Sequence, residues 1–429
     1  MNASHPPKLI RTVGFWGLVA MCINAVVGSG VFLLPSESFK LLGPFSLWGP
    51  LLFAVPVFIL VLCFAEAASH FDEPGGAFLY ARSAFGDFVG FETGWMNWLA
   101  RVTSLASLTN GFVIALGALA PGVTTGMQRA VVIVATILIL TVIHILGIRY
   151  GAGSIYVLTL GKLLPLVGFI VVALAAWKTN PIPASLVLPG AEAKWADAML
   201  FMLFAYAGFE NLAAPAGEFK NPRRDLPIAL LVATLAIATI YSLVQLGTMS
   251  ALTDLSQTAT PVASAAVALI GPAGGVIVTV GALLSIAGTN SGTVLEGSRM
   301  LYALALTRGI GSLSSIHRRF HTPAFAIAVH SGLALALALG GTFRQLALLS
   351  AVARLATYLV TCLALPRLRK TNEGFRTPGL IVPILGGLIS LTFVLSLDSR
   401  KLLAAALALL VGAIVYALSG LGARARFPG

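Results

Sequence analysis

Twelve apolar segments, each long enough to cross a lipid bilayer, constrain this chain more than any other feature of its sequence. A helix needs about 20 apolar residues to cross a hydrocarbon core of roughly 30 Å. Of the 429 residues, 58% are hydrophobic and 10% are charged, which lies outside the usual composition of soluble globular domains. The sequence therefore predicts an all-α, multi-pass membrane protein. The twelve predicted transmembrane helices cover residues 13–34, 47–69, 88–118, 127–146, 155–177, 196–216, 226–249, 273–306, 325–339, 346–365, 381–397 and 402–421.

The basic residues are distributed unequally between the predicted loops. Loops on the side of the N-terminus carry sixteen of the 27 Lys and Arg residues, whereas the opposite loops carry seven. Because basic residues accumulate in cytoplasmic loops, we predict a protein of the cell inner (cytoplasmic) membrane with both termini in the cytoplasm. Residues 70–87 are too polar and glycine-rich to span, and we expect a short cytoplasmic helix and loop there.

Two predicted spans are interrupted by glycine near their middle. The first contains "NAVVGSGVFLLP", with Gly28, Ser29 and Gly30 at mid-membrane, and the sixth contains "MLFMLFAYAGFENLAAPAGEFKNP", with Gly208. Unwound chain is tolerated in hydrocarbon only where protein or a water-filled cavity satisfies its backbone groups. A single break suggests a packing kink, but matched breaks five spans apart are typical of the substrate site between inverted repeats of a transporter.

The two breaks offer complementary backbone groups to a zwitterion. A half-helix that begins at a break exposes N–H groups, and one that ends there exposes carbonyl groups. We expect a carboxylate to bind the amides of Ser29, Gly30 and Val31. We expect an ammonium group to bind the carbonyl oxygens freed at the second break, which belong to Phe204, Ala205 and Tyr206. Small L-amino acids carry both groups.

Four cations fall within predicted spans, at equivalent places in the two halves of the chain. Lys162 and Arg354 lie in spans five and ten, and Arg101 and Arg299 lie in spans three and eight. We expect Arg299 to lie at a membrane surface with Glu296 as its i,i+3 partner. Arg101 and Arg354 are expected to form structural pairs or to reach the surface, not to contact a ligand.

The sequence resembles a known family over essentially the whole chain, and three segments in the first, fifth and sixth predicted spans carry the resemblance most clearly. "VVGSGVFLLP", "TLGKLLPLVGF" and "FAYAGFENLAAPAGEFKNPRRDLPIA" resemble the amino acid-polyamine-organocation superfamily of transporters. The resemblance implies a leucine-transporter-type fold with alternating access to a central site. Its five-plus-five inverted repeats are expected in residues 1–178 and 179–370, with two additional helices in residues 371–429.

The resemblance also implies roles for residues at both breaks. Gly28, Ser29 and Gly30 would bind the substrate carboxylate, and an aromatic at Phe204 would close over the substrate or simply pack in the bundle. The amino-group side would be lined by Ala205, Ala207 and Gly208. Further candidate lining residues are Asn24, Tyr206, Asn211, Ser285 and Asn290.

Lys162 needs a partner, because a lysine at the centre of a membrane helix costs about 2.5–3.5 kcal/mol on insertion scales. The resemblance places it where sodium-driven relatives bind their cation, beside the first break and Ser285. A buried lysine can lose its proton near neutral pH, which would link transport to protons. Alternatively, Lys162 is a permanent cation that holds the carbonyls of span one. Glu210 either complements the helix dipole at the second break or acts as a proton-sensing or gating group.

The sequence lacks the motifs of the common enzyme classes. It contains no H-E-x-x-H helix, G-x-S-x-G turn or G-x-x-x-x-G-K-[ST] loop, and its Lys and Arg residues form no basic stripe for nucleic acid. Cys22, Cys63 and Cys362 lie within apolar segments, so we expect no disulfide, no metal and no other cofactor. We predict no enzymatic activity, and a channel would need a ring of like residues that one chain with unequal spans does not offer.

The combined prediction is a secondary active transporter embedded in the lipid bilayer. It moves L-amino acids together with protons, and its substrates are either neutral amino acids or a broad range of amino acids. The alternative is an exchanger of arginine or a polyamine, with Glu210 as the acidic partner of the distal cation. A membrane channel or a membrane-embedded enzyme is the alternative from another class.

Overall fold

The computed structural model of the protein describes residues 14–71, 75–147, 152–176, 193–211, 220–371, 375–377 and 379–426. Throughout these ranges the regular structure is helical, with fifteen α-helices and no β-strand. The α-helices are α1 (Phe15–Val26), α2 (Gly30–Leu42), α3 (Gly49–Ser69), α4 (Gly76–Phe85), α5 (Asp87–Gly117), α6 (Gly126–Ile145), α7 (Ala152–Ala175), α8 (Trp195–Tyr206), α9 (Pro222–Ala251), α10 (Pro261–Ile270), α11 (Pro272–Arg308), α12 (Ala324–Gly340), α13 (Phe343–Thr371), α14 (Ile381–Leu395) and α15 (Ser399–Arg426).

Seven α-helices of the described ranges are long and apolar enough to cross a bilayer alone: α3, α5, α6, α9, α11, α13 and α15. The pair α1 and α2 passes the same test as one span with a bend of 46°. The chain is therefore a multi-pass membrane protein. The predicted segments 155–177, 325–339 and 381–397 overlap the shorter apolar helices α7, α12 and α14, and the first half of the predicted segment 196–216 overlaps α8. The count of twelve spans and the inverted repeat stay predictions.

Two further helices lie between the predicted spans. Helix α4 falls within residues 70–87, where we expected a short helix and loop. Helix α10 has no counterpart among the predicted elements, because its apolar run is too short to suggest a span. Proline at its first position, Pro261, favours helix initiation, and Gly271 ends it with φ +77°, a conformation that glycine adopts without steric cost.

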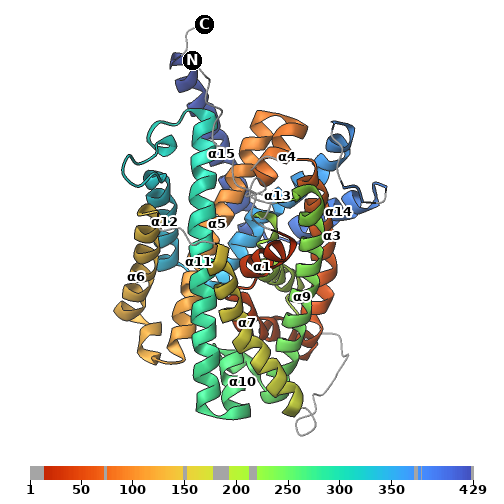
Figure 1. The fold of residues 1–429 in the computed structure, drawn as a ribbon, viewed down its shortest axis with the longest axis vertical. Coiled ribbons are helices and arrows are strands. Elements are labelled where there is room, and N and C mark those ends of the chain that lie inside the picture. Colours follow the sequence, from red (N-terminus) through yellow and green to blue (C-terminus); the bar gives the residue numbers. More distant parts are fainter. Residues whose placement is uncertain are drawn as a thin grey trace.

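The breaks lie inside the bundle because the helices around them form its centre. Helices α5 and α13 pack together there, and α11 runs along α5 (Figure 1). In the most apolar window of α5, 72% of the residues are buried in the protein, compared with 6% in α15, which faces outward. Helix α1 contacts α7, α9 and α11. The junction of α1 and α2 is therefore surrounded by protein and not by lipid.

Candidate functional site

The first break separates α1 from α2. Helix α1 ends at Val26, Val27 is extended with ψ 94°, and α2 begins at Gly30. The N–H groups of Ser29, Gly30 and Val31 donate no hydrogen bond to any residue of the described ranges. The buried Ser29 hydroxyl also has no partner there. The start of α2 thus presents several unsatisfied donors in the protein interior, as the sequence predicts.

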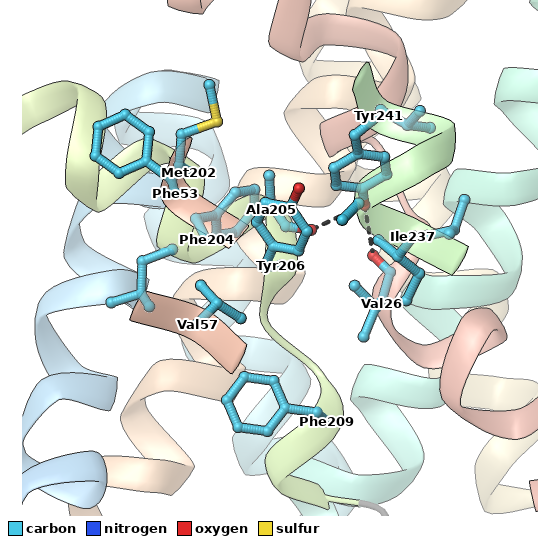
Figure 2. Packing of buried hydrophobic residues seen from close by; sticks show 14 of the residues in the cluster. Val26, Phe53, Val57, Met202, Phe204, Ala205, Tyr206, Phe209, Ile237 and Tyr241 are labelled. Atoms are coloured by element: carbon cyan, nitrogen blue, oxygen red, sulfur yellow. Dashed lines mark hydrogen bonds between the residues drawn. The ribbon is translucent and has the colours of Figure 1, made fainter. Parts of the chain in front are cut away.

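The second break follows α8. Helix α8 ends at Tyr206, Ala207 is extended, and Gly208 has φ +135°. Figure 2 shows the chain leaving the helix between Tyr206 and Phe209. Only a short 3-10 turn, Phe209–Asn211, follows within the described ranges. Residues 212–216 of the predicted span 196–216, like the Asn211 side chain, lie outside the described residues.

The two breaks are in direct contact. A Cβ atom on Gly30 would lie 3.1 Å from the Cα atom of Ala205. A Cβ atom on Gly208 would lie 2.7 Å from the carbonyl oxygen of Ala25 and 3.2 Å from the Cα atom of Val26. Because neither position has room for a side chain, glycine is what allows the two unwound segments to meet.

The carbonyl groups of the second break are largely occupied in this conformation. The hydroxyl of Tyr241 in α9 donates a hydrogen bond to the Ala205 carbonyl at 2.9 Å and lies 3.4 Å from the Val26 carbonyl (Figure 2). The Phe204 carbonyl accepts the N–H of Ala207 at 3.2 Å. The expectation of free carbonyls at Phe204 and Ala205 is therefore wrong for this conformation, since Tyr241 and a tight turn already use them.

The aromatic side chains at the end of α8 are packed. The Phe204 ring meets Phe343 of α13 edge to face, with 6.1 Å between ring centroids, and lies near Phe201. The Tyr206 hydroxyl donates to the Pro50 carbonyl at 2.8 Å. Phe204 is thus part of an apolar cluster in this conformation, consistent with the packing alternative.

Lys162 reaches the first break from α7. Its buried ammonium nitrogen lies 3.0 Å from the Asn24 carbonyl and 2.8 Å from the Val27 carbonyl, and it donates to the Thr289 hydroxyl at 3.4 Å. The Ser285 hydroxyl lies 3.2 Å from the same Val27 oxygen. The structure therefore brings Lys162 and Ser285 together at one carbonyl group. Thr289 was not among the predicted residues, although its place one turn after Ser285 puts it on the same face of α11.

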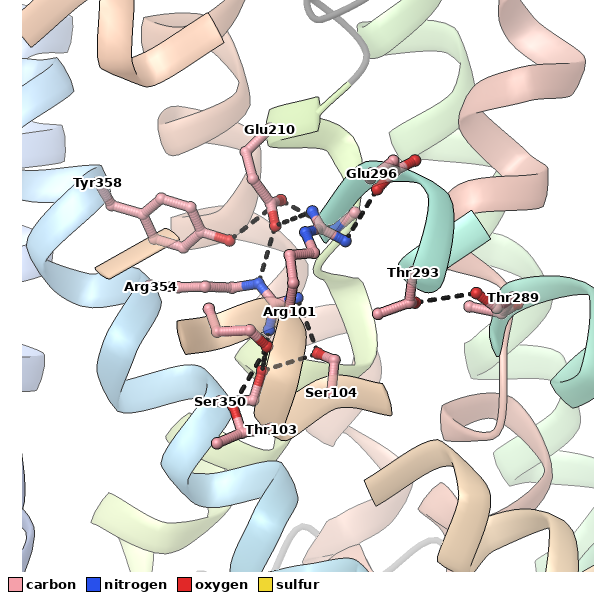
Figure 3. A network of polar contacts seen from close by, with 12 residues as sticks. Arg101, Thr103, Ser104, Glu210, Thr289, Thr293, Glu296, Ser350, Arg354 and Tyr358 are labelled. Atoms are coloured by element: carbon pink, nitrogen blue, oxygen red, sulfur yellow. Dashed lines mark hydrogen bonds and ion pairs between the residues drawn. The ribbon is translucent and has the colours of Figure 1, made fainter. Parts of the chain in front are cut away.

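Glu210 is held by a buried network (Figure 3). Its Oε1 lies 3.1 Å from an Arg101 guanidinium nitrogen and 2.8 Å from Arg354 Nε. Its Oε2 accepts the backbone N–H of Gly208 at 2.8 Å and the Tyr358 hydroxyl at 3.3 Å. The carboxylate thus satisfies a backbone group of the second break, in the manner of the dipole-complementing alternative.

Arg101 and Arg354 have further partners that complete this network. Arg101 also pairs with Glu296 of α11 at 3.2 Å, so two acids face two arginines. Arg354 donates to the hydroxyls of Ser104 and Ser350. The expected pair between Glu296 and Arg299 is wrong, because Glu296 turns toward α5 and Arg299 is exposed.

Ion pairs tie the other ends of the half-helices to the bundle. Glu37 of α2 lies 3.8 Å from Arg344 of α13. Asp197 of α8 lies 3.4 Å from Arg344 and 2.7 Å from Lys401 of α15. Half-helix α2 is therefore tied to α13, and half-helix α8 is tied to α13 and α15, with Arg344 as the residue that the two share.

Two further predicted lining residues, Asn24 and Asn290, carry buried polar atoms. The Asn24 side-chain oxygen and both polar atoms of the Asn290 side chain have no partner within the described ranges. In that part of the chain, no three His, Cys, Asp or Glu residues gather as a metal site would require.

The sequence of the chain is similar to those of known proteins along most of its length. The chain matches the amino acid permease family over residues 13–416. It is 30% identical to the serine/threonine exchanger of Bacillus subtilis (strain 168) over 377 residues, which cover 85% of each chain. It is 27% identical over 390 residues to an uncharacterised transporter of Mycobacterium tuberculosis (strain ATCC 25618 / H37Rv), covering 85% of this chain and 81% of the relative.

A third relative comes from Escherichia coli (strain K12) and carries the name "Putative arginine/ornithine antiporter". It is 30% identical over 302 residues, which cover 65% of this chain and 64% of the relative. A family match over nearly the whole chain and relatives named as transporters together show that the chain belongs to the amino acid permease family of the amino acid-polyamine-organocation superfamily.

Proposed function

We propose that this protein is a secondary active transporter that carries small neutral L-amino acids across the cytoplasmic membrane by alternating access, coupled to protons. One observation carries the proposal: the two unwound segments meet in the interior, and the first offers free amide groups and a free hydroxyl. Buried donors without partners are costly, so a ligand that accepts their hydrogen bonds would be bound strongly.

The substrate carboxylate binds at the start of α2. The amides of Ser29, Gly30 and Val31 and the Ser29 hydroxyl form an anion site of the kind found at helix N-termini. The ammonium group binds on the side of Ala205, Ala207 and Gly208, once the contact between Gly30 and Ala205 opens. The present packed conformation is then one state of the cycle, and substrate binding separates the breaks.

The state of Glu210 supports a neutral substrate. A cationic side chain, as in arginine, would need an acidic partner near the site. Both carboxylate oxygens of Glu210 are already paired, with Arg101, Arg354 and the Gly208 amide. Glu210 is therefore not free to pair with the cationic side chain of a substrate. The name of the B. subtilis relative agrees with a small neutral substrate, whereas that of the E. coli relative keeps a cationic amino acid as the second candidate.

Lys162 supplies the proposed link to protons. Its ammonium group satisfies the carbonyls of Asn24 and Val27 at the end of α1. Loss of the proton would remove these charge-assisted bonds and loosen the first break, so protonation and the geometry of the carboxylate site depend on each other. The alternative is a Lys162 that stays charged throughout the cycle.

The same proposal includes twelve transmembrane helices, with inverted repeats in residues 1–178 and 179–370, two additional helices in residues 371–429, and both termini in the cytoplasm. The two ion-paired half-helices α2 and α8 lie on the extracellular side in this orientation. Their bonds to Arg344 and Lys401 would then hold the outer entrance closed in the conformation described.

Uptake into proteoliposomes tests the function. Labelled serine, threonine, alanine, leucine, arginine and ornithine are offered with and without an inward proton gradient, and counterflow of unlabelled substrate separates a carrier from a channel. We expect gradient-driven accumulation of small neutral amino acids, lost in Lys162→Ala and retained in the exposed-residue control Lys194→Ala. Wild-type uptake that ignores pH, or driven accumulation by Lys162→Ala, would contradict the coupling. Preferred uptake of arginine would favour the second candidate.

A further inference from the structure

Two cysteines that are far apart in the sequence meet in the interior. Cys63 of α3 and Cys362 of α13 are both buried, and both are free thiols. Each sulfur atom lies 2.8 Å from the position that a Cβ atom on Gly386 of α14 would take. The two sulfurs are therefore no more than twice that distance apart. The small glycine of α14 leaves the space into which both thiols point.

This thiol pair adjoins the second break through aromatic residues. Phe64 follows Cys63 directly, and Tyr358 lies one turn before Cys362. The rings of Phe64 and Tyr358 both contact Phe209, with centroid distances of 5.5 Å in each case, and lie 5.4 Å from one another. Phe209 belongs to the turn after Gly208, and Tyr358 also donates to Glu210 (Figure 3). The thiols are thus one aromatic layer away from the unwound segment.

We propose that Cys63 and Cys362 form a binding site for one soft, thiol-seeking metal ion that prefers two ligands, such as Hg(II), and that occupation of this site arrests the protein. Soft ions of this kind select thiolate ligands. On binding, each thiol releases its proton and each sulfur forms one bond to the metal. Two thiolates and one divalent ion are neutral together, which suits a site from which water is excluded, because an uncompensated charge there would be costly.

Arrest follows from what the bridge connects. A metal held by both sulfurs joins α3 to α13 and fixes Phe64 and Tyr358, the two rings that enclose Phe209. The second break could then not move relative to α13. The proposed arrest rests on the proposed transport cycle, whereas the metal site does not depend on it.

Retention of mercury tests the site. The purified full-length protein is treated with one equivalent of HgCl2, washed with excess monothiol, denatured, and assayed for free thiols and for bound mercury by mass. We expect wild type to retain one mercury and to show one reactive thiol. Cys22→Ser, the matched control on α1, should retain one mercury and show none.

Single-cysteine variants of the pair should lose this retention. Cys63→Ser and Cys362→Ser each leave one ligand. A monothiol should therefore remove mercury at a concentration about a hundredfold lower than for wild type, since joining two ligands raises the overall affinity by about 10²–10⁴-fold. Size-exclusion chromatography and thermal unfolding check that the variants are folded. Equal release from wild type and from folded single variants would overturn the site.

Uptake into proteoliposomes tests the arrest. HgCl2 should abolish uptake by wild type and by Cys22→Ser, while Cys63→Ser and Cys362→Ser keep most of theirs. Retained mercury with undiminished uptake would overturn the arrest and leave the site standing. If untreated protein transports no amino acid, the proposed function fails, and mercury retention still decides the site.

Discussion

Gly208 and Ala25 lie so close that a Cβ atom on the glycine would be 2.7 Å from the alanine carbonyl oxygen. The same glycine has φ +135°, a conformation that other residues adopt only with strain. We therefore predict that Gly208→Ala lowers the free energy of unfolding by about 1–3 kcal/mol and abolishes uptake. Thermal unfolding of the purified protein and uptake into proteoliposomes measure the two effects.

Gly332→Ala is the matched control for this substitution. Gly332 lies on an exposed face of α12, and a Cβ atom there would meet no other atom within 4 Å. Alanine should stabilise the helix by about 0.5–1 kcal/mol and leave uptake intact. Equal behaviour of the two variants would show that the contact between the breaks is unimportant.

Tyr241→Phe removes the hydroxyl that joins the two breaks. The carbonyl of Ala205 loses its donor, and that of Val26 loses a nearby one. Leaving a buried acceptor unsatisfied costs about 1–3 kcal/mol, so the unfolding temperature should fall and the KM for uptake should change. Tyr80→Phe should do neither, because the buried Tyr80 hydroxyl has no partner within the described ranges.

Glu210→Gln removes the carboxylate that faces two buried arginines. Arg101 loses one of its two acids, and Arg354 is left without a carboxylate partner among the described residues. Breaking a buried ion pair by removing one partner costs about 3–5 kcal/mol. Glu296→Gln should cost about 1 kcal/mol or less, since the Glu296 side chain is 34% exposed. Unfolding curves of both variants check this order, and the reverse order would contradict the central place of Glu210.

Asp398 should make stability depend on pH. Its carboxylate accepts the Lys401 ammonium at 2.7 Å and the Lys401 backbone N–H at 2.9 Å, and these bonds lower the pKa of Asp398 below its ordinary value of 3.8. A carboxyl group whose pKa is lower in the folded state stabilises that state above the ordinary value and loses this effect as the pH falls. Asp398→Asn should therefore lower the unfolding temperature at neutral pH, and the difference should vanish well below pH 3.8. A difference that stays constant across pH would rule out this carboxylate as its source.

The local features of the site could be predicted because each follows from a few neighbouring residues. A glycine-serine-glycine sequence within an apolar run predicts a weak point in a membrane helix, and the structure has a break there, between Val26 and Gly30. A lysine in the middle of an apolar helix must find acceptors in the protein, and Lys162 finds the carbonyls that this break frees.

The long-range partners could not be predicted, because they depend on how helices pack. Tyr241 lies 36 residues after Ala205 and is one of several tyrosines, so nothing in its own helix marks it as the residue that joins the breaks. Glu296 was assigned to Arg299 by helical spacing, but the buried Arg101 of α5 offers a partner that is less well solvated. The meeting of Cys63 with Cys362 likewise appears only when α3, α13 and α14 are packed together.

The ammonium group of Lys162 occupies the carbonyls of Asn24 and Val27 while remaining covalently attached to α7. A dissolved ion in that position could be taken up on one side of the membrane and given off on the other. A tethered charge cannot diffuse away, and the only part of it that can leave is its proton. If the cycle draws energy through this position, as we propose, that energy comes from a difference in proton concentration and not from a sodium gradient.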